Sequence, residues 1–459
     1  MSMMSMKDAH SVIQQILGGP RVLEMPRLER IHNAMRVDGE FTPTVCMPPD
    51  APRVYAELAR KSHTDFLRLI LKEFSQAIKV EGYITKSDES ARGPWWWWQR
   101  NQMDARQAGL TRSVLKYGAS YALAYPGDFN GIAGPAVRCF SPRQMTAVYA
   151  NDWDEWPMYA LYTDRLHTVL VDAEGEYRFG VKNPSQQQLV DAALSPSVWS
   201  SNLEPIERRL HGMGFAPVVR YTDRWLLDGE MEYGIVEPLL SKQEHIDQIE
   251  YEKSVAQYTT AFRQRYVENW VPEDPSQELK SNPGAVWYIA AEDADGNAVD
   301  VKVGEFSETD LTGYLNSGAQ ARRDLASLAQ IPVHNLGIDG VSNISGDALE
   351  ALNNSRNQEA SEISTSLGES HEQLMRLFAY IDDDTLASED YESEVRWADL
   401  NSRTYAQMVD GLSKLVAANI ISPDDALDDV PGMTDQRAQR IRDRGPIAPV
   451  ETDPVASLD

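Results

Sequence analysis

Three long stretches of this chain carry apolar residues at helical spacing, and their length restricts the fold more than any other feature of the sequence. In residues 236–265 apolar side chains recur at steps of three and four residues, which predicts a helix about 45 Å long. The same spacing predicts helices over residues 307–331 and 345–381. Amphipathic helices of this length find no obvious partner within a compact domain. We therefore expect neighbouring copies of the chain to cover their apolar stripes.

A compact strand-turn-strand pattern separates the first two of these helices. Residues 286–290 and 299–303 flank Asp295-Gly296, a dipeptide typical of a hairpin turn. This pattern predicts a small β module between the helices. After the second helix, residues 334–344 are rich in Gly, Asn and Ser, which predicts a loop before the third helix begins.

The N-terminal half alternates between helical and strand patterns. Residues 65–79 and 95–117 have helical spacing, whereas residues 119–125, 137–140 and 147–149 are rich in aromatic and branched side chains, as strands are. We therefore predict an α+β region that extends to Tyr221.

The C-terminal part is expected to be helical. The acidic residues from Asp382 to Glu394 predict a solvated link. Helices are predicted over residues 402–419, from Ser422-Pro423 onwards, and over residues 434–444. The sequence from Gly445 contains three prolines and predicts a disordered tail.

The charge balance limits the kind of partner that the chain can hold. It has 70 acidic and 43 basic residues among 459, a formal net charge of −27. Such a surface disfavours tight binding of nucleic acid but is compatible with a passage that lets DNA slide. A chain of this length predicts two or more structural regions.

Neither the cysteines nor the apolar runs indicate an extracellular or membrane protein. Cys46 and Cys139 lie far apart and are predicted to be buried free thiols, without a disulfide or zinc site. No run of about 18 uncharged apolar residues occurs. We expect a soluble, intracellular protein.

Motifs that would indicate catalysis are missing from the sequence. No GxxxxGK[ST], HExxH or GxSxG pattern occurs, and Pro217 occupies the last position of the single GxGxxG-like run. A calcium loop around Asp293 and Asp295 lacks its glycine at Ala298 and its glutamate at Gly304. We therefore predict no enzymatic activity, no cofactor and no metal.

Two other features each leave two interpretations. The tryptophans 95–98 could stack on sugars or bases, but four adjacent helical residues point all round the helix, which favours core or subunit packing. The last helix carries arginines that either meet DNA or form salt bridges on a solvated face. These arginines are Arg437, Arg440, Arg442 and Arg444.

Several short motifs occur in the order found in a known family. The chain contains WQRNQMD at 98–104, YGASY at 117–121, FSP at 140–142, GFAPVV at 214–219 and GIVEPLL at 234–240. Further motifs are GAVW at 284–287, VGEF at 303–306 and NISGDAL at 343–349. In these motifs and in its order of elements, the chain resembles the portal (head-to-tail connector) proteins of tailed bacteriophages, of the type found in actinobacterial siphophages.

This resemblance implies an α+β fold with named regions. They are an N-terminal segment and α+β wing (1–235), a stem helix (236–265), a clip (266–304), a second stem helix (305–331), a tunnel loop (332–344), a long wing helix (345–385), a helical crown (386–444) and a tail (445–459). It further implies a homo-oligomeric ring, a dodecamer, at one capsid vertex of the virion. Double-stranded DNA would pass through the ring during packaging and ejection, after assembly in the host cytoplasm.

The resemblance also implies partners and contact residues. The partners are the terminase large subunit, a head-completion or adaptor protein, and the major capsid and scaffold proteins. The tunnel-loop residues are Leu336, Gly337, Asp339, Gly340, Val341, Ser342 and Asn343. The clip candidates for docking are Trp270, Trp287 and Tyr288, with packing inside the β module as the alternative for the tryptophans.

Two other classes of protein stay open at this point. A minor head or adaptor protein of a phage would share the acidity but would not need the order of helix, β insert and helix. An enzyme with an unrecognised active site would instead have a deep pocket with perturbed acids.

Overall fold

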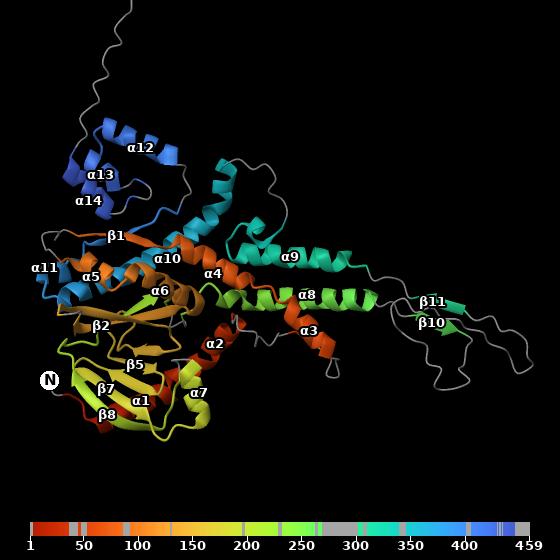
Figure 1. Ribbon diagram of the computed structural model, residues 1–459, viewed down its shortest axis with the longest axis horizontal. Helices are drawn as coiled ribbons and strands as arrows, with labels where there is room; N and C mark the ends of the chain where they lie inside the picture. Colours follow the sequence, from red (N-terminus) through yellow and green to blue (C-terminus); the bar gives the residue numbers. More distant parts are fainter. Residues whose placement is uncertain are drawn as a thin grey trace, which may run out of the picture.

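The computed structural model shows a mixed helix-and-sheet body from which a pair of long helices projects (Figure 1). The α+β fold class predicted from the sequence is confirmed. The structure describes residues 3–35, 45–46, 53–85, 92–128, 131–194, 198–227, 232–261, 265–268, 302–305, 310–338, 346–400, 405–428, 430, 433 and 435–445.

Two antiparallel sheets form the strand part of the body. A three-stranded sheet has the order β3-β2-β9, and a five-stranded sheet follows the chain in the order β4-β5-β6-β7-β8. The strands are β2 (Ala119–Asp128), β3 (Ala133–Phe140), β9 (Val218–Thr222), β4 (Met145–Val148), β5 (Tyr159–Asp164), β6 (His167–Val171), β7 (Gly175–Val181) and β8 (Leu203–Leu210). The predicted strands over residues 119–125, 137–140 and 147–149 correspond to β2, β3 and β4.

The N-terminal helices were not predicted from the sequence. Helix α1 (Met6–Gly18) begins at Ser5, whose hydroxyl accepts the backbone N–H of Asp8, and it buries Ile13 against the five-stranded sheet. Helix α2 (Pro20–Ala34) continues toward the base of the projecting pair. Helix α1 has an apolar face, with Ala9, Ile13 and Ile16 buried, that was not recognised in the sequence, whereas α2 has no regular apolar period, so its packing surface shows only in the folded chain.

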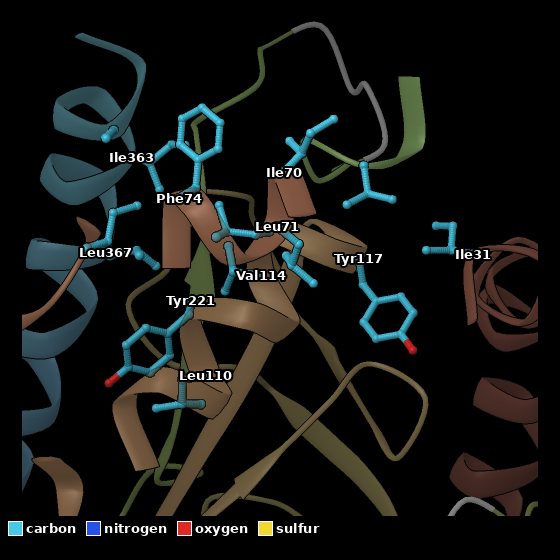
Figure 2. Packing of buried hydrophobic residues seen from close by; sticks show 14 of the residues in the cluster. Ile31, Ile70, Leu71, Phe74, Leu110, Val114, Tyr117, Tyr221, Ile363 and Leu367 are labelled. Carbon is cyan, nitrogen blue, oxygen red and sulfur yellow. The ribbon is translucent and has the colours of Figure 1, made fainter. Parts of the chain in front are cut away.

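The main core lies where three helices meet the three-stranded sheet. These helices are α4 (Phe66–Ala77), α6 (Met103–Tyr117) and α10 (Gly346–Ile381). Figure 2 shows the packing of Ile70, Phe74, Leu110, Val114, Tyr221, Ile363 and Leu367. The apolar face predicted over residues 65–79 is therefore confirmed, with Asp65 capping α4 through the N–H of Arg68.

The single helix predicted over residues 95–117 is wrong. The chain forms α5 (Pro94–Arg100) and α6, and Gln102 between them has a φ of 54°, which a continuous helix cannot contain. Trp97 and Trp98 are fully buried in the main core. The packing interpretation of these two tryptophans is thereby confirmed.

The projecting pair consists of α8 (Leu240–Ala261) and α9 (Thr312–Leu328), joined by the ladder of β10 (Arg265–Glu268) with β11 (Lys302–Glu305). A short 3-10 helix, η1 (Glu237–Leu239), precedes α8. The predicted helix over residues 236–265 is thus confirmed in its middle and is shorter at both ends. The hairpin turn at Asp295-Gly296 and the cap at Ser307 lie outside the described residues.

The acidic stretch after α10 has exposed side chains at Asp383, Glu389 and Glu394, as a solvated segment should, but it forms ordered elements and not a simple link as predicted. Asp384 caps α11 (Thr385–Ser388), and Asp382 accepts a 2.7 Å hydrogen bond from the indole N–H of Trp97. Strand β12 (Glu394–Trp397) then pairs with β1 (Val80–Ile84), more than 300 positions earlier in the chain. The carboxylates serve as hydrogen-bond acceptors that fasten this segment to the body.

The remaining elements complete the body and the C-terminal group. They are α3 (Arg53–Ser62), α7 (Gln186–Leu194), α12 (Tyr405–Ala417), α13 (Pro423–Asp428) and α14 (Asp435–Arg444). Ser422 caps α13 by accepting the N–H of Asp425, as its sequence predicts. Cys46 and Cys139 are both free, but Cys46 is exposed, so the prediction of a buried thiol is wrong for it. Among the described helices, none combines the length and apolar character needed to cross a membrane.

Candidate functional site

The helix pair and its ladder leave several apolar side chains exposed. On α8, Ile246, Ile249 and Tyr251 are buried, but none of the side chains described between Tyr251 and the end of the helix is. The apolar residues that stay exposed along the pair and its ladder are Tyr258 (37%), Tyr266 (40%), Val303 (54%), Leu315 (57%) and Leu328 (57%). A single chain therefore presents an incompletely covered apolar surface along this pair.

The middle of the pair is packed through a small residue. Gly318 is buried in α9, and a methyl group at this position would lie 3.7 Å from Cγ2 of Ile249 and 3.5 Å from Oε1 of Glu250 on α8. The two helices are thus in ordinary van der Waals contact about midway along the pair.

A buried hydrogen-bond cluster attaches α8 to the corner between α3 and α4. Nδ1 of His63 lies 2.7 Å from Oδ2 of Asp247, and the amide of Gln243 donates to Oδ1 of Asp247 at 2.8 Å and to the carbonyl of Thr64 at 2.6 Å. Burial alone would lower the pKa of His63, but the hydrogen bond and charge of Asp247 raise it overall. The cluster fixes the direction in which α8 leaves the body.

An ion pair holds the start of the same helix. Arg27 of α2 donates from Nε to Oε1 of Glu237 at 2.8 Å and from Nη2 to Oε2 at 2.6 Å, and Nη2 also donates to the carbonyl of Glu232. A bidentate pair of this kind restricts orientation as well as distance. Helix α2, which the sequence did not predict, is therefore a direct support of the projecting pair.

A second ionic cluster lies where the end of α9 meets α10. Nη2 of Arg224 lies 3.1 Å from the buried carboxylate of Asp223 and 2.9 Å from Glu359 of α10, while Gln330 donates to Glu359 at 3.5 Å. Burial raises the pKa of Asp223 to about 7 against the opposing effect of Arg224. This cluster ties the residues directly after β9 and after α9 to α10.

The predicted tunnel loop begins in the described part of the chain and continues beyond it. Helix η2 (Val333–Leu336) buries Leu336 in the main core, and the side-chain amide of Asn335 donates to both carboxylate oxygens of Glu73 at 2.8 and 2.9 Å. Gly337 then turns the chain with a φ of 70°. Leu336 and Asn335 thus anchor the start of the loop.

The other predicted contact residues lie outside the described residues. These are Asp339, Gly340, Val341, Ser342 and Asn343 of the loop, and Trp270, Trp287 and Tyr288 of the β module. Within the part of the chain that the structure describes, no three His, Cys, Asp or Glu side chains are grouped so as to hold a metal ion.

The WQRNQMD segment at residues 98–104 has a structural role. The indole N–H of Trp98 donates to Asp104 at 2.9 Å. The buried amide of Asn101 donates to the carbonyls of Trp97 and Pro135 and accepts the N–H of Val137. The three motif positions therefore join α5, α6 and strand β3, and the sequence could identify the motif but not these contacts.

One family model and several solved structures match this chain. The family model described as phage portal protein, SPP1 Gp6-like, matches residues 38–445. No curated protein matches the chain. Among solved structures, the chain is similar to the neck of an empty gene transfer agent (GTA) particle computed with C6 symmetry, with 13% identity, a TM-score of 0.47, and coverage of 83% of this chain and 94% of that one.

Two other structures of the same kind of particle are similar. The neck of the native GTA particle computed with C12 symmetry has 13% identity and a TM-score of 0.44, covering 84% of this chain and 96% of that one. The virion of the native GTA particle has 14% identity and a TM-score of 0.43, covering 83% and 94%. Because the family model spans residues 38–445 of 459, this chain belongs to the SPP1 Gp6-like family of phage portal proteins.

Proposed function

We propose that this chain assembles into a closed homo-oligomeric ring, a dodecamer, at one vertex of a phage capsid, and that DNA passes through the ring during packaging and ejection. The observation that carries the proposal is the helix pair α8–α9, whose outer half leaves Tyr258 and Leu315 uncovered in a single chain. In a ring, each copy would cover this surface on the next copy, to which it is related by rotation. Because every subunit makes the same contact, the ring closes without leaving an apolar edge exposed.

The regions of the chain take their roles from this proposal. Residues 236–265 and 305–331 are the stem, residues 266–304 the clip, residues 1–235 and 345–385 the wing, and residues 386–444 the crown. The clip, with Trp270, Trp287 and Tyr288, would meet the terminase large subunit and later a head-completion or adaptor protein. The wing would contact the major capsid and scaffold proteins, in the host cytoplasm during assembly and in the virion afterwards.

The loop from Leu336 to Asn343 would face the channel. Its anchor at Leu336 and Asn335 holds it to the body, whereas Gly340, Ser342 and Asn343 supply small neutral groups. The loop carries no basic side chain, so it would touch DNA without trapping it by counterion release.

Electron microscopy of the purified protein tests the ring. Wild type should form discs with a central hole, whereas Leu315→Asp should shift the protein toward monomers because it places a charge in the interface. Leu189→Asp on α7, at a residue that is also exposed, is the matched control and should leave the discs intact. A strictly monomeric wild type at high concentration would refute the proposal.

A deletion tests the loop separately. Removal of residues 337–343 should leave discs intact but prevent stable retention of packaged DNA in a packaging assay. Normal packaging would show that the loop does not face the channel. Filter binding of bare duplex should be weak at physiological salt, and tight, salt-sensitive binding would contradict a channel that does not hold DNA.

A further inference from the structure

Two exposed tryptophans line one hollow in the surface of the body. Trp153 is 77% exposed and lies in the turn between β4 and β5, and Trp225 is 63% exposed and follows β9. The hollow has a volume of about 210 Å³, and its lining also includes Tyr391 and side chains of α10. Exposed tryptophans that gather around one hollow, together with the exposed Tyr391, indicate a surface for a partner.

Hydrogen bonds to α10 hold the walls of this tryptophan hollow in place. The side-chain amide of Gln373 donates to the carbonyl of Glu155 at 2.7 Å, which fastens the turn that carries Trp153. The hydroxyl of Ser370 donates to the carbonyl of Arg220 at 3.0 Å, which fastens β9. Because the supporting backbone is already ordered, a partner that docks here spends little binding energy on ordering it.

The arginines of the hollow are already engaged with its tyrosines. The guanidinium carbon of Arg376 lies 4.5 Å from the ring centroid of Tyr391, and that of Arg220 lies 4.4 Å from the ring centroid of Tyr149. In the part of the chain that the structure describes, no arginine, lysine or aromatic ring stacks on either tryptophan of the hollow. Tryptophan offers the best aromatic face for a cation, so two such faces stay available.

Acidic side chains without a cation partner border the same hollow. The carboxylate of Asp154 accepts the backbone N–H and the side-chain amide of Asn151, and neither it nor the exposed Glu369 forms an ion pair with a described residue. The two arginines, in contrast, are balanced by Glu155 at 3.6 Å and by Glu232 at 3.2 Å. The hollow therefore combines negative charge with aromatic faces, which favours a cationic occupant.

We propose that the tryptophan hollow binds an arginine or lysine side chain on an apolar segment of another protein. Its volume lies below the range of about 300–1,000 Å³ typical of small-molecule sites, so one long side chain fits it better than a cofactor does. A second copy of this chain is the less suitable occupant, because its net charge of −27 opposes the carboxylates of the hollow. The partner is thus a protein with a basic, apolar segment.

A short peptide of sequence GLRALRG with blocked ends probes the hollow directly. Added to the full-length protein, it should lower the hydroxyl-radical oxidation rates of Trp153 and Trp225 at least about twofold, because it covers their faces. Leu210, exposed at the end of β8, is the internal reference and should not change. The peptide GLEALEG should protect neither tryptophan. Equal protection by both peptides, or protection by neither, would overturn the proposal.

Matched variants separate the contribution of the rings from that of the charge. Trp153→Ala with Trp225→Ala should weaken binding of GLRALRG at least about tenfold in titration calorimetry, and Glu369→Gln should weaken it about threefold. Leu210→Ala and Glu204→Gln, at exposed positions of β8, are the controls and should bind the peptide as wild type does. Because all five side chains are exposed, each variant should unfold at the wild-type temperature. Undiminished binding by the tryptophan variant would contradict the site.

Footprinting without peptide distinguishes a basic partner from a neighbouring copy. Equal oxidation rates of Trp153 and Trp225 in the purified ring and in the dilute monomer support the basic partner. Slower oxidation in the ring would show that a second copy covers the hollow and would overturn the assignment. Binding at the hollow does not require the ring, so a protein that forms no discs but binds GLRALRG would refute the proposed function and leave this site standing.

Discussion

Nδ1 of His63 lies 2.7 Å from Oδ2 of Asp247, which joins the corner before α4 to the first half of α8. Both side chains are largely buried, and the carboxylate also accepts the amide of Gln243. This contact is one of several polar links between the projecting helix and the body, and its protonation state can be tested directly.

Asp247→Asn should lower stability in a way that depends on pH. Because the folded-state pKa of His63 is raised above its ordinary value of 6.5, the stabilisation is fully present below that value and is lost as pH rises through the folded-state pKa. The substitution should cost about 1–3 kcal/mol at pH 6 and less at pH 9, measured by thermal unfolding. In a His63→Gln background, Asp247→Asn should lower stability by the same amount at both pH values. A difference between the two pH values that persists in this background would have to come from another titratable group.

His371 should make the protein sensitive to acid. Burial lowers the pKa of His371 to about 3, and the ring lies edge to face with Trp98 and Tyr221. Above pH 6.5 His371 is neutral in both the folded and the unfolded chain, so its burial does not make stability depend on pH. As the pH drops from 6.5 toward 3, only the unfolded chain takes up a proton at this residue, so the free energy of unfolding falls. His371→Gln should be less stable at pH 7 yet show a smaller loss between pH 7 and pH 4.

Replacing a second histidine distinguishes the pH effect of His371 from the effect of losing any histidine. His167 is exposed at the start of β6, so His167→Gln should keep the wild-type difference between pH 7 and pH 4. If the two variants lose the same amount of stability on acidification, the titration does not arise from His371.

Two glycines should respond to alanine in opposite directions. At Gly118 the φ is 91°, and an added methyl group would lie 2.6 Å from the backbone nitrogen of Tyr233, so Gly118→Ala should cost at least about 2 kcal/mol. At Gly318, inside α9, the methyl group meets only ordinary contacts, so Gly318→Ala should gain up to about 1 kcal/mol of helix stability. Chemical denaturation of both variants checks the prediction, which fails if Gly318→Ala is the more harmful change.

Asn101→Ala should destabilise the body. The substitution removes three hydrogen bonds and leaves the carbonyl of Pro135 and the N–H of Val137 without this buried partner, whereas the carbonyl of Trp97 keeps the backbone N–H at position 101. Unpaired buried polar groups cost about 1–3 kcal/mol each, so the thermal midpoint should fall clearly. Asn151→Ala, which removes an exposed amide from a turn, should cost about 0.5 kcal/mol and serves as the control.

The sequence predicted those local features of the fold that depend on the residues of a single helix or strand. Periodicity and capping chemistry identify features that depend only on consecutive residues. These features are the apolar spacing of α4, α8, α9 and α10 and the cap at Ser422. The break at Gln102 was missed because the residues on both sides of it continue the same helical spacing. The portal family was identified from the order of short motifs, and the family model confirms it.

The sequence by itself determined which residues form the long helices and which family the chain belongs to. The tertiary structure decided what those elements touch: the pairing of β12 with β1, the reach of Asp382 to Trp97, and the hollow that Trp153 and Trp225 share with α10. The physical reason is that periodicity records the apolar face of one element, whereas contacts between distant segments depend on how several such faces pack at once. No single stretch of the chain contains that information.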